Sequence, residues 1–75
     1  MNIYLRKINP DTNCFRFYCI RIDRDLFAER SLSVHWGRIG TAGRQQVRGS
    51  GSAEEVERIA GKILKLRLRH GYAET

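Results

Sequence analysis

The sequence predicts a small α+β domain, with an antiparallel sheet of about four strands and one C-terminal helix packed on it. Extended segments separated by turn residues occupy the first fifty positions, and one long apolar pattern of helical spacing follows Ser52. A chain of 75 residues can enclose only one core. We therefore treat residues 1–75 as a single domain.

The first two extended segments are separated by a polar turn. The first spans Ile3 to Ile8 and stops at a run of turn residues, Asn9, Pro10, Asp11 and Thr12. The second spans residues 13–23 and is apolar on both alternations, one with Phe15, Phe17 and Cys19 and the other with Tyr18, Ile20 and Ile22. Either a bulge near Cys19 or a strand covered on both faces accounts for this pattern.

A charged loop precedes the clearest strand of the sequence. Residues 23–30 mix acidic and basic residues around Leu26 and Phe27, which is typical of a loop held by one apolar contact. Residues 31–38 then alternate regularly, with Leu32, Val34 and Trp36 on one face. We expect that face to point towards the core.

A glycine-rich turn joins this strand to the next. Three glycines fall within residues 37–43, so the backbone is expected to turn sharply and to approach another group closely. Residues 45–48 are expected to return as a polar strand with Val47 facing inward. Residues 49–51, Gly-Ser-Gly, are interpreted as a short flexible connection.

The C-terminal helix is predicted by its ends and by its periodicity. Ser52 and Glu55 have the capping-box spacing, and Gly71 follows the last helical residues. An apolar face is formed by Val56, Ile59, Ala60, Ile63 and Leu64, and is expected to be widened by Leu66 and Leu68. Acidic residues at the start and basic residues towards the end are typical of complementarity to the helix dipole. The basic residues are therefore only secondary binding candidates: Arg58, Lys62, Lys65, Arg67 and Arg69.

Several classes of function are not supported by the sequence. No Ser, Cys and His arrangement indicates catalysis, so we predict that the chain is not an enzyme and needs no cofactor. Cys14 and Cys19 are five residues apart on a strand and should remain two free thiols. His35 and His70 match no zinc spacing, so no metal is predicted. With no membrane span or signal peptide, we expect an intracellular, cytoplasmic protein that has no membrane partner.

The charge of the chain points to a polyanionic partner. The net charge is +6, and eleven of the fourteen cations are arginines. Between Arg30 and Ala53 there are four arginines and no acidic residue. Arg44, Gln46 and Arg48 share one alternation, so they should project from one side, where they could follow a phosphate backbone.

Trp36 has two interpretations. An indole beside a basic patch can pack on a sugar ring or stack on an unpaired base. Because it shares its alternation with Leu32 and Val34, packing in the core or at its edge is about equally consistent with the sequence. The neighbouring Arg38 favours the binding role modestly, although it could be an ordinary surface arginine.

The run Trp36, Gly37, Arg38, Ile39, Gly40, Thr41, Ala42, Gly43 resembles the signature of the WGR domain, which is named for its first three residues. The similarity extends over nearly the whole chain. WGR domains occur in poly(ADP-ribose) polymerases, where they recognise DNA break ends, and in bacterial proteins. The resemblance implies that Trp36 lies against the sugar-phosphate backbone near a DNA terminus, that Gly37 permits close approach, and that Arg38 contacts phosphate or a neighbouring protein domain. The family often has Gln after the last glycine, whereas this chain has Arg44.

Two hypotheses for function follow. The first is a DNA-binding module without sequence specificity that prefers ends or nicks. Its candidate contact residues are Trp36, Gly37, Arg38, Arg44, Gln46 and Arg48. The second is a protein-interaction or regulatory module with an acidic partner, which could also use a sheet edge to recruit a strand. RNA ranks third, because the chain lacks an aromatic pair of the kind that stacks successive bases.

Overall fold

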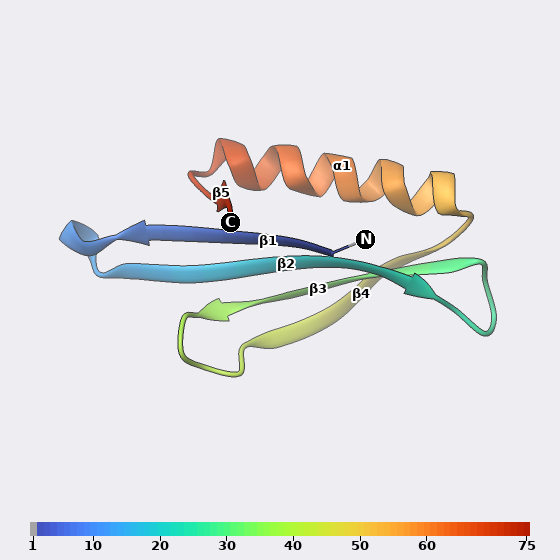
Figure 1. Cartoon of the computed structure of the whole chain (residues 1–75), viewed down its shortest axis with the longest axis horizontal. Helices are drawn as coiled ribbons and strands as arrows, with labels where there is room; N and C mark the ends of the chain where they lie inside the picture. Colours follow the sequence, from blue (N-terminus) through green and yellow to red (C-terminus); the bar gives the residue numbers. More distant parts are fainter. Residues whose placement is uncertain (1) are drawn as a thin grey trace.

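The computed structural model describes residues 2–75, which form an antiparallel sheet with one helix lying across one face (Figure 1). The elements in chain order are β1 (Asn2–Asn9), the 3-10 turn η1 (Pro10–Thr12), β2 (Cys14–Arg24), β3 (Arg30–Arg38), β4 (Arg44–Gly51), α1 (Ala53–Arg69) and β5 (Ala73–Glu74). The predicted α+β class is confirmed. The sheet has five strands rather than about four, because a two-residue strand follows the helix.

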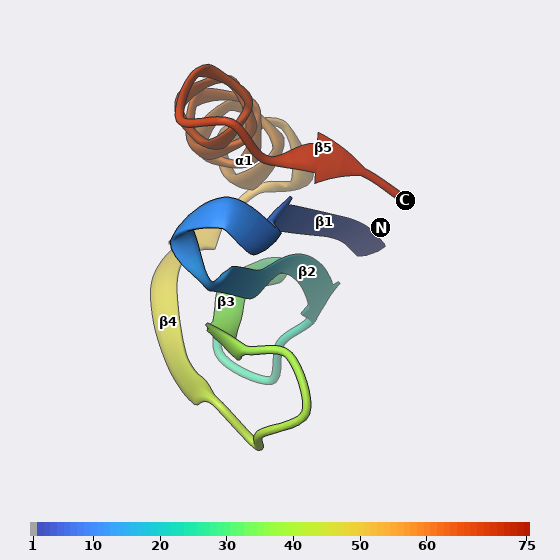
Figure 2. The ribbon, with the colours of Figure 1, turned by 90° about the vertical axis from the view of Figure 1, so that its left-hand side faces the viewer.

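The strand order in the sheet is β4-β3-β2-β1-β5. The first four strands therefore pair with their neighbours in the chain, and only β5 returns from the helix to pair with β1, where Leu5 lies opposite Glu74. Figure 2 shows the sheet curling beneath the helix, with β4 at one edge and β5 beside β1 at the other. The long edge strand is thus β4.

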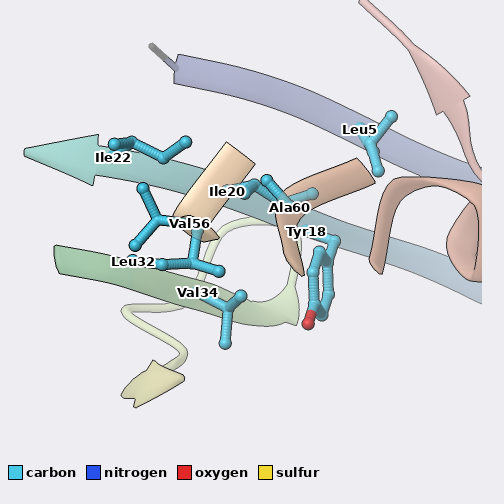
Figure 3. Packing of buried hydrophobic residues seen from close by; sticks show 8 residues of the cluster. All are labelled: Leu5, Tyr18, Ile20, Ile22, Leu32, Val34, Val56 and Ala60. Carbon is cyan, nitrogen blue, oxygen red and sulfur yellow. The ribbon is translucent and has the colours of Figure 1, made fainter. Parts of the chain in front are cut away.

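The core lies between α1 and the facing side of the sheet (Figure 3). Its buried members are Leu5, Tyr18, Ile20, Ile22, Leu32, Val34, Val56 and Ala60. β2 pairs with both neighbours through Cys19 without a shift of register, so the predicted bulge does not occur there. Cys19 is nevertheless buried on the opposite face, which means that the alternative of two covered faces is correct.

Both cysteines are free thiols, as predicted. Cys19 lies opposite Tyr4 in the register of β1 and β2. Burial raises the pKa of the Cys19 thiol, although a hydrogen bond with Tyr4 and the charge of Arg21 act in the other direction. The thiol is therefore held in its neutral form.

The loop between β2 and β3 differs from the prediction of an apolar contact. Leu26 is 95% exposed and Phe27 is 97% exposed. The loop is instead shaped by Asp25, whose Oδ1 accepts a hydrogen bond from the Phe27 backbone N–H at 2.9 Å. A local side-chain acceptor of this kind forms a turn without apolar packing.

Two predictions for the next segment are wrong. Residues 49–51 continue β4 rather than forming a flexible connection, and Val47 is exposed rather than inward. Val47 faces outward because the turn pairs Arg44 with Trp36, and regular pairing from there places Val47 opposite Ser33 on the outer face. A register shift after Val47 then places Gly49 opposite Leu32. A Cβ on Gly49 would lie 3.1 Å from Ile59 Cδ1, so the helix crosses the strand closely at this glycine.

Both ends of α1 have the predicted caps. The Glu55 backbone N–H donates to Ser52 Oγ at 3.1 Å. At the other end, Gly71 has a φ of 95° and the Tyr72 N–H donates to the Arg67 carbonyl at 3.1 Å, which is a Schellman motif. Leu66 and Leu68, however, are 44% and 45% exposed and do not widen the buried face. Among residues 2–75, no helix is long and apolar enough to cross a membrane.

Replacing Ser52 with Ala is expected to lower the free energy of unfolding by about 1 kcal/mol, because the Glu55 N–H then loses its acceptor. Chemical denaturation followed by circular dichroism measures the change. Ser50→Ala, at an exposed position of β4, is the matched control and should change stability by less than about 0.5 kcal/mol. Equal effects of the two substitutions would contradict the role of the cap.

Candidate nucleic-acid interface

The end of β3, the start of β4 and the end of α1 lie at the same end of the molecule (Figure 1). Residues from these segments and from β2 line a groove of about 630 Å³. We call it the arginine groove. It is lined by Arg16, Tyr18, Trp36, Gly37, Arg38, Gln46, Arg48, Arg67 and Tyr72. The volume exceeds that of a single phosphate group and is within the range of small-molecule sites.

The register of the sheet explains why these side chains meet. Tyr18 lies opposite Trp36, and Arg16 lies opposite Arg38. Residues directly opposite each other in an antiparallel pair share one face, which here is the face that carries the core. Along this face of the sheet, the buried Val34 is followed by Trp36 and then by arginines, which lie beyond the part that the helix covers.

Trp36 lies both at the edge of the core and on the surface of the arginine groove. It is partly buried against the core cluster, and its ring stacks on that of Tyr18 with 6.5 Å between centroids and 28° between planes. It also lines the arginine groove. Trp36 is therefore the residue at which the core ends and the groove begins.

Arg38 is held in place by neutral groups. Its guanidinium donates to the backbone oxygen of Asn13 at 3.3 Å and to Oδ1 of the same residue at 3.1 Å. Its Cζ also lies 5.4 Å from the centroid of the Phe15 ring. These contacts orient the guanidinium but leave its charge uncompensated.

The glycine-rich turn folds back against the opposite face of the sheet. The Nε2 of His35 donates to the carbonyl of Ala42, and the Ile39 N–H donates to the Phe15 carbonyl at 2.8 Å. His35 is thus a satisfied strand histidine, as expected. A Cβ on Gly37 would lie 2.7 Å from the Cα of Gly43. The close approach that the sequence indicated is therefore made by the turn itself.

Gly43 is the residue on which this turn depends most. Its φ is 71°, in the left-handed region. A Cβ there would overlap the Trp36 carbonyl oxygen and lie 2.7 Å from Cζ of the Phe17 ring. Gly43 thus lets the chain pass directly over the backbone of Trp36.

Three groove residues were not selected from the sequence, namely Arg16, Tyr18 and Tyr72, and Arg67 was only a secondary candidate. Arg67 follows Ile63 by four positions, so it continues the stripe that faces the sheet, and its Cζ lies 4.3 Å from the centroid of the Tyr18 ring. Tyr72 is brought in by the Schellman motif and contacts Tyr18 with 6.1 Å between ring centroids. Two features of the sequence could have indicated a place in the groove: the helical spacing of Arg67 from Ile63, and the strand alternation that Arg16 shares with Tyr18.

The groove is strongly positive. Its lining contains four arginines, Arg16, Arg38, Arg48 and Arg67, and no carboxylate. The ion pair found among residues 2–75 is that of Arg21 with Asp23, at 3.7 Å and half exposed, which lies outside the groove. Groups of three or more potential metal ligands are absent from the same part of the chain.

The predicted contact residues are divided by the fold. Trp36, Gly37, Arg38, Gln46 and Arg48 line the groove together. Arg44 lies opposite Trp36 at the start of the edge strand but is not among the lining residues. Arg30 pairs with Arg24 at the far end of β3. The four arginines between Arg30 and Ala53 therefore do not form one cluster, and the groove instead recruits Arg16 and Arg67.

The comparison with protein families agrees with the tryptophan, glycine and arginine at the end of β3. The family described as the WGR domain matches residues 1–75. The chain belongs to the WGR domain family. WGR domains are binding modules associated with nucleic acids.

One relative of this WGR domain is the uncharacterized protein y4dW of Sinorhizobium fredii, which is 33% identical over 70 residues. The match covers 93% of the present chain and 34% of y4dW, so the chain spans about a third of that relative's length. No solved structure gave a significant match.

Proposed function

We propose that this WGR domain binds DNA without sequence specificity through the arginine groove and prefers duplex ends or nicks. The observation that carries the proposal is the set of four groove arginines with no carboxylate among the lining residues. Planar guanidinium groups bind phosphate in a bidentate manner, because two parallel N–H donors match two of its oxygens. Contacts of this kind fix a strand in place without reading its bases.

The preference for ends is supported by the aromatic part of the groove. Trp36 and Tyr72 both line it, next to the arginines. Within a continuous duplex the bases are stacked on each other, whereas an end or a nick exposes a sugar ring and a base face that an aromatic side chain can contact. A groove with cations beside aromatic rings is therefore better matched to a strand terminus than to an uninterrupted backbone.

Replacing Arg38 with Ala is expected to weaken binding of a blunt duplex about tenfold, because one charge-assisted contact with phosphate is lost. The preference for ended over closed duplex should fall with it. Fluorescence anisotropy with labelled blunt duplex, nicked duplex, closed dumbbell and single strand, each at two salt concentrations, measures both effects.

Arg58→Ala is the matched control for this experiment. Arg58 is an exposed helix residue outside the groove, and its removal changes the net charge by the same amount. Equal losses in the two variants would mean that only overall charge matters. If the wild-type domain ignores all four DNAs but binds polyglutamate in an Arg38-dependent way, the partner is an acidic protein and the proposal is wrong.

A further inference from the structure

We propose that the floor of the arginine groove is a subsite for one phosphate group, to which the hydroxyl of Tyr18 and the Nε–H of Arg67 donate hydrogen bonds. That this phosphate belongs to a DNA strand rests on the function proposed above. The subsite itself rests on a separate observation, which is the state of these two donors.

Tyr18 is an unusual residue for a protein core. It is 2% exposed, and its hydroxyl has no hydrogen-bond partner among residues 2–75. A buried polar group without a partner destabilises a fold by about 1 to 3 kcal/mol, and most buried hydroxyl groups are therefore paired. A phenylalanine would fill the same space without this penalty. A ligand that accepts a hydrogen bond from the hydroxyl accounts for it.

Arg67 presents a second donor of the same kind. Its guanidinium lies over the Tyr18 ring at 4.3 Å, and its buried Nε also has no partner among residues 2–75. Both residues line the same groove. Two side chains in contact with each other, one from β2 and one from the last turns of α1, thus each carry a buried donor without a partner among residues 2–75.

The chemistry of the surroundings identifies the ligand as a phosphate. Nε of Arg67 can only donate, and the other groove arginines also offer only donors. A neutral acceptor such as a base carbonyl would leave their charge uncompensated. A tetrahedral phosphate carries several acceptor oxygens and negative charge, so it can satisfy donors that converge from different directions.

Access to the floor requires a side chain to move. Both donor atoms are covered, and the groove is also lined by three further arginines and a glutamine, whose side chains are long and unbranched. Such side chains change rotamer readily. Binding should therefore alter the surroundings of Trp36, the single tryptophan of the chain, whose fluorescence then reports occupancy of the groove.

Tyr18→Phe is the decisive variant. It should unfold at the same temperature as the wild type or higher, because the hydroxyl that it removes has no partner in the protein. It should bind blunt duplex about tenfold more weakly, because a hydrogen bond to a charged group is lost. Thermal unfolding and anisotropy measure the two properties. Tyr4→Phe, exposed on β1 outside the groove, is the control and should not change affinity.

Arg67→Lys provides a second and independent variant. It keeps the positive charge but removes the Nε–H and the planar fork, so it should also weaken binding about tenfold if the hydrogen bond matters. A duplex with 5′-phosphates, the same duplex with 5′-hydroxyls and a closed dumbbell distinguish a terminal phosphate from one within the backbone. Titration with inorganic phosphate, followed by Trp36 fluorescence, tests the subsite without DNA.

The outcomes separate the two proposals. If Tyr18→Phe and Arg67→Lys bind duplex like the wild type while Arg38→Ala does not, the subsite is wrong and DNA binding stands. If the wild type binds no DNA but inorganic phosphate changes Trp36 fluorescence in it and not in Tyr18→Phe, the subsite stands and DNA binding is wrong. No response to phosphate, together with wild-type DNA affinity in both variants, overturns the subsite.

Discussion

The affinity of the domain for duplex DNA is expected to fall about 150-fold when monovalent salt rises from roughly 0.05 M to 0.2 M. Each phosphate neutralised by a cation contributes about −0.9 to the slope of log affinity against log salt. Contacts by the four groove arginines give a slope of about −3.6. Anisotropy titrations at five or six salt concentrations measure this slope directly.

Single arginine variants test the same expectation residue by residue. Arg48→Gln should reduce the slope to about −2.7, because one phosphate contact is removed. Arg58→Gln carries the same charge change outside the groove and should leave the slope near −3.6. A slope close to zero for the wild type would show that released counterions do not drive binding, and the DNA proposal would then fail.

Gly43→Ala is expected to lower the free energy of unfolding by about 3 to 5 kcal/mol. Two effects add: the left-handed backbone at φ 71°, and the overlap of the new Cβ with the Trp36 carbonyl and the Phe17 ring. The backbone at Trp36 must shift to relieve the overlap, so DNA affinity should fall as well. Chemical denaturation and anisotropy on the same preparation measure both properties.

Gly40→Ala separates the two effects. Gly40 also has a left-handed backbone, with a φ of 94°, but a Cβ there would meet nothing within 4 Å. Only the backbone penalty of about 1 to 2 kcal/mol should remain. Similar losses in both variants would mean that the contact of Gly43 with Trp36 contributes nothing to stability.

Local signals in the sequence predicted the elements well. Ser52 and Gly71 mark helix ends through hydrogen bonds made within a few residues, so the caps can be read without the rest of the fold. The alternation of Leu32, Val34 and Trp36 predicted one buried face because β3 is covered by the helix on that side alone. Trp36 and Arg38 were found for the groove because they belong to a recognisable motif.

The remaining differences come from contacts between distant segments. The outward position of Val47 depends on the pairing of Arg44 with Trp36 across the turn, which the sequence of β4 alone does not predict. Leu66 and Leu68 flank Arg67 on the helix and are half exposed, whereas Arg67 itself faces Tyr18 on the sheet. From the sequence alone, Arg67 is explained by the favourable interaction of a cation with the C-terminal end of the helix dipole. Its contact with the Tyr18 ring is seen only in the folded structure. β5 forms only because β1 offers a free edge.

The order of the strands in the sheet also governs how the groove is assembled. Strands β1 to β4 pair with their chain neighbours, so most of the sheet can form through successive hairpins. Arg67 and Tyr72, in contrast, come from the C-terminal end of the chain and contact Tyr18 near its beginning. The Schellman motif holds them in place, together with the Thr75 N–H, which donates to the Tyr4 carbonyl at 3.0 Å. Terminal segments are the first to open. A DNA strand that contacts these C-terminal residues would therefore stabilise the part of the domain that unfolds locally most easily.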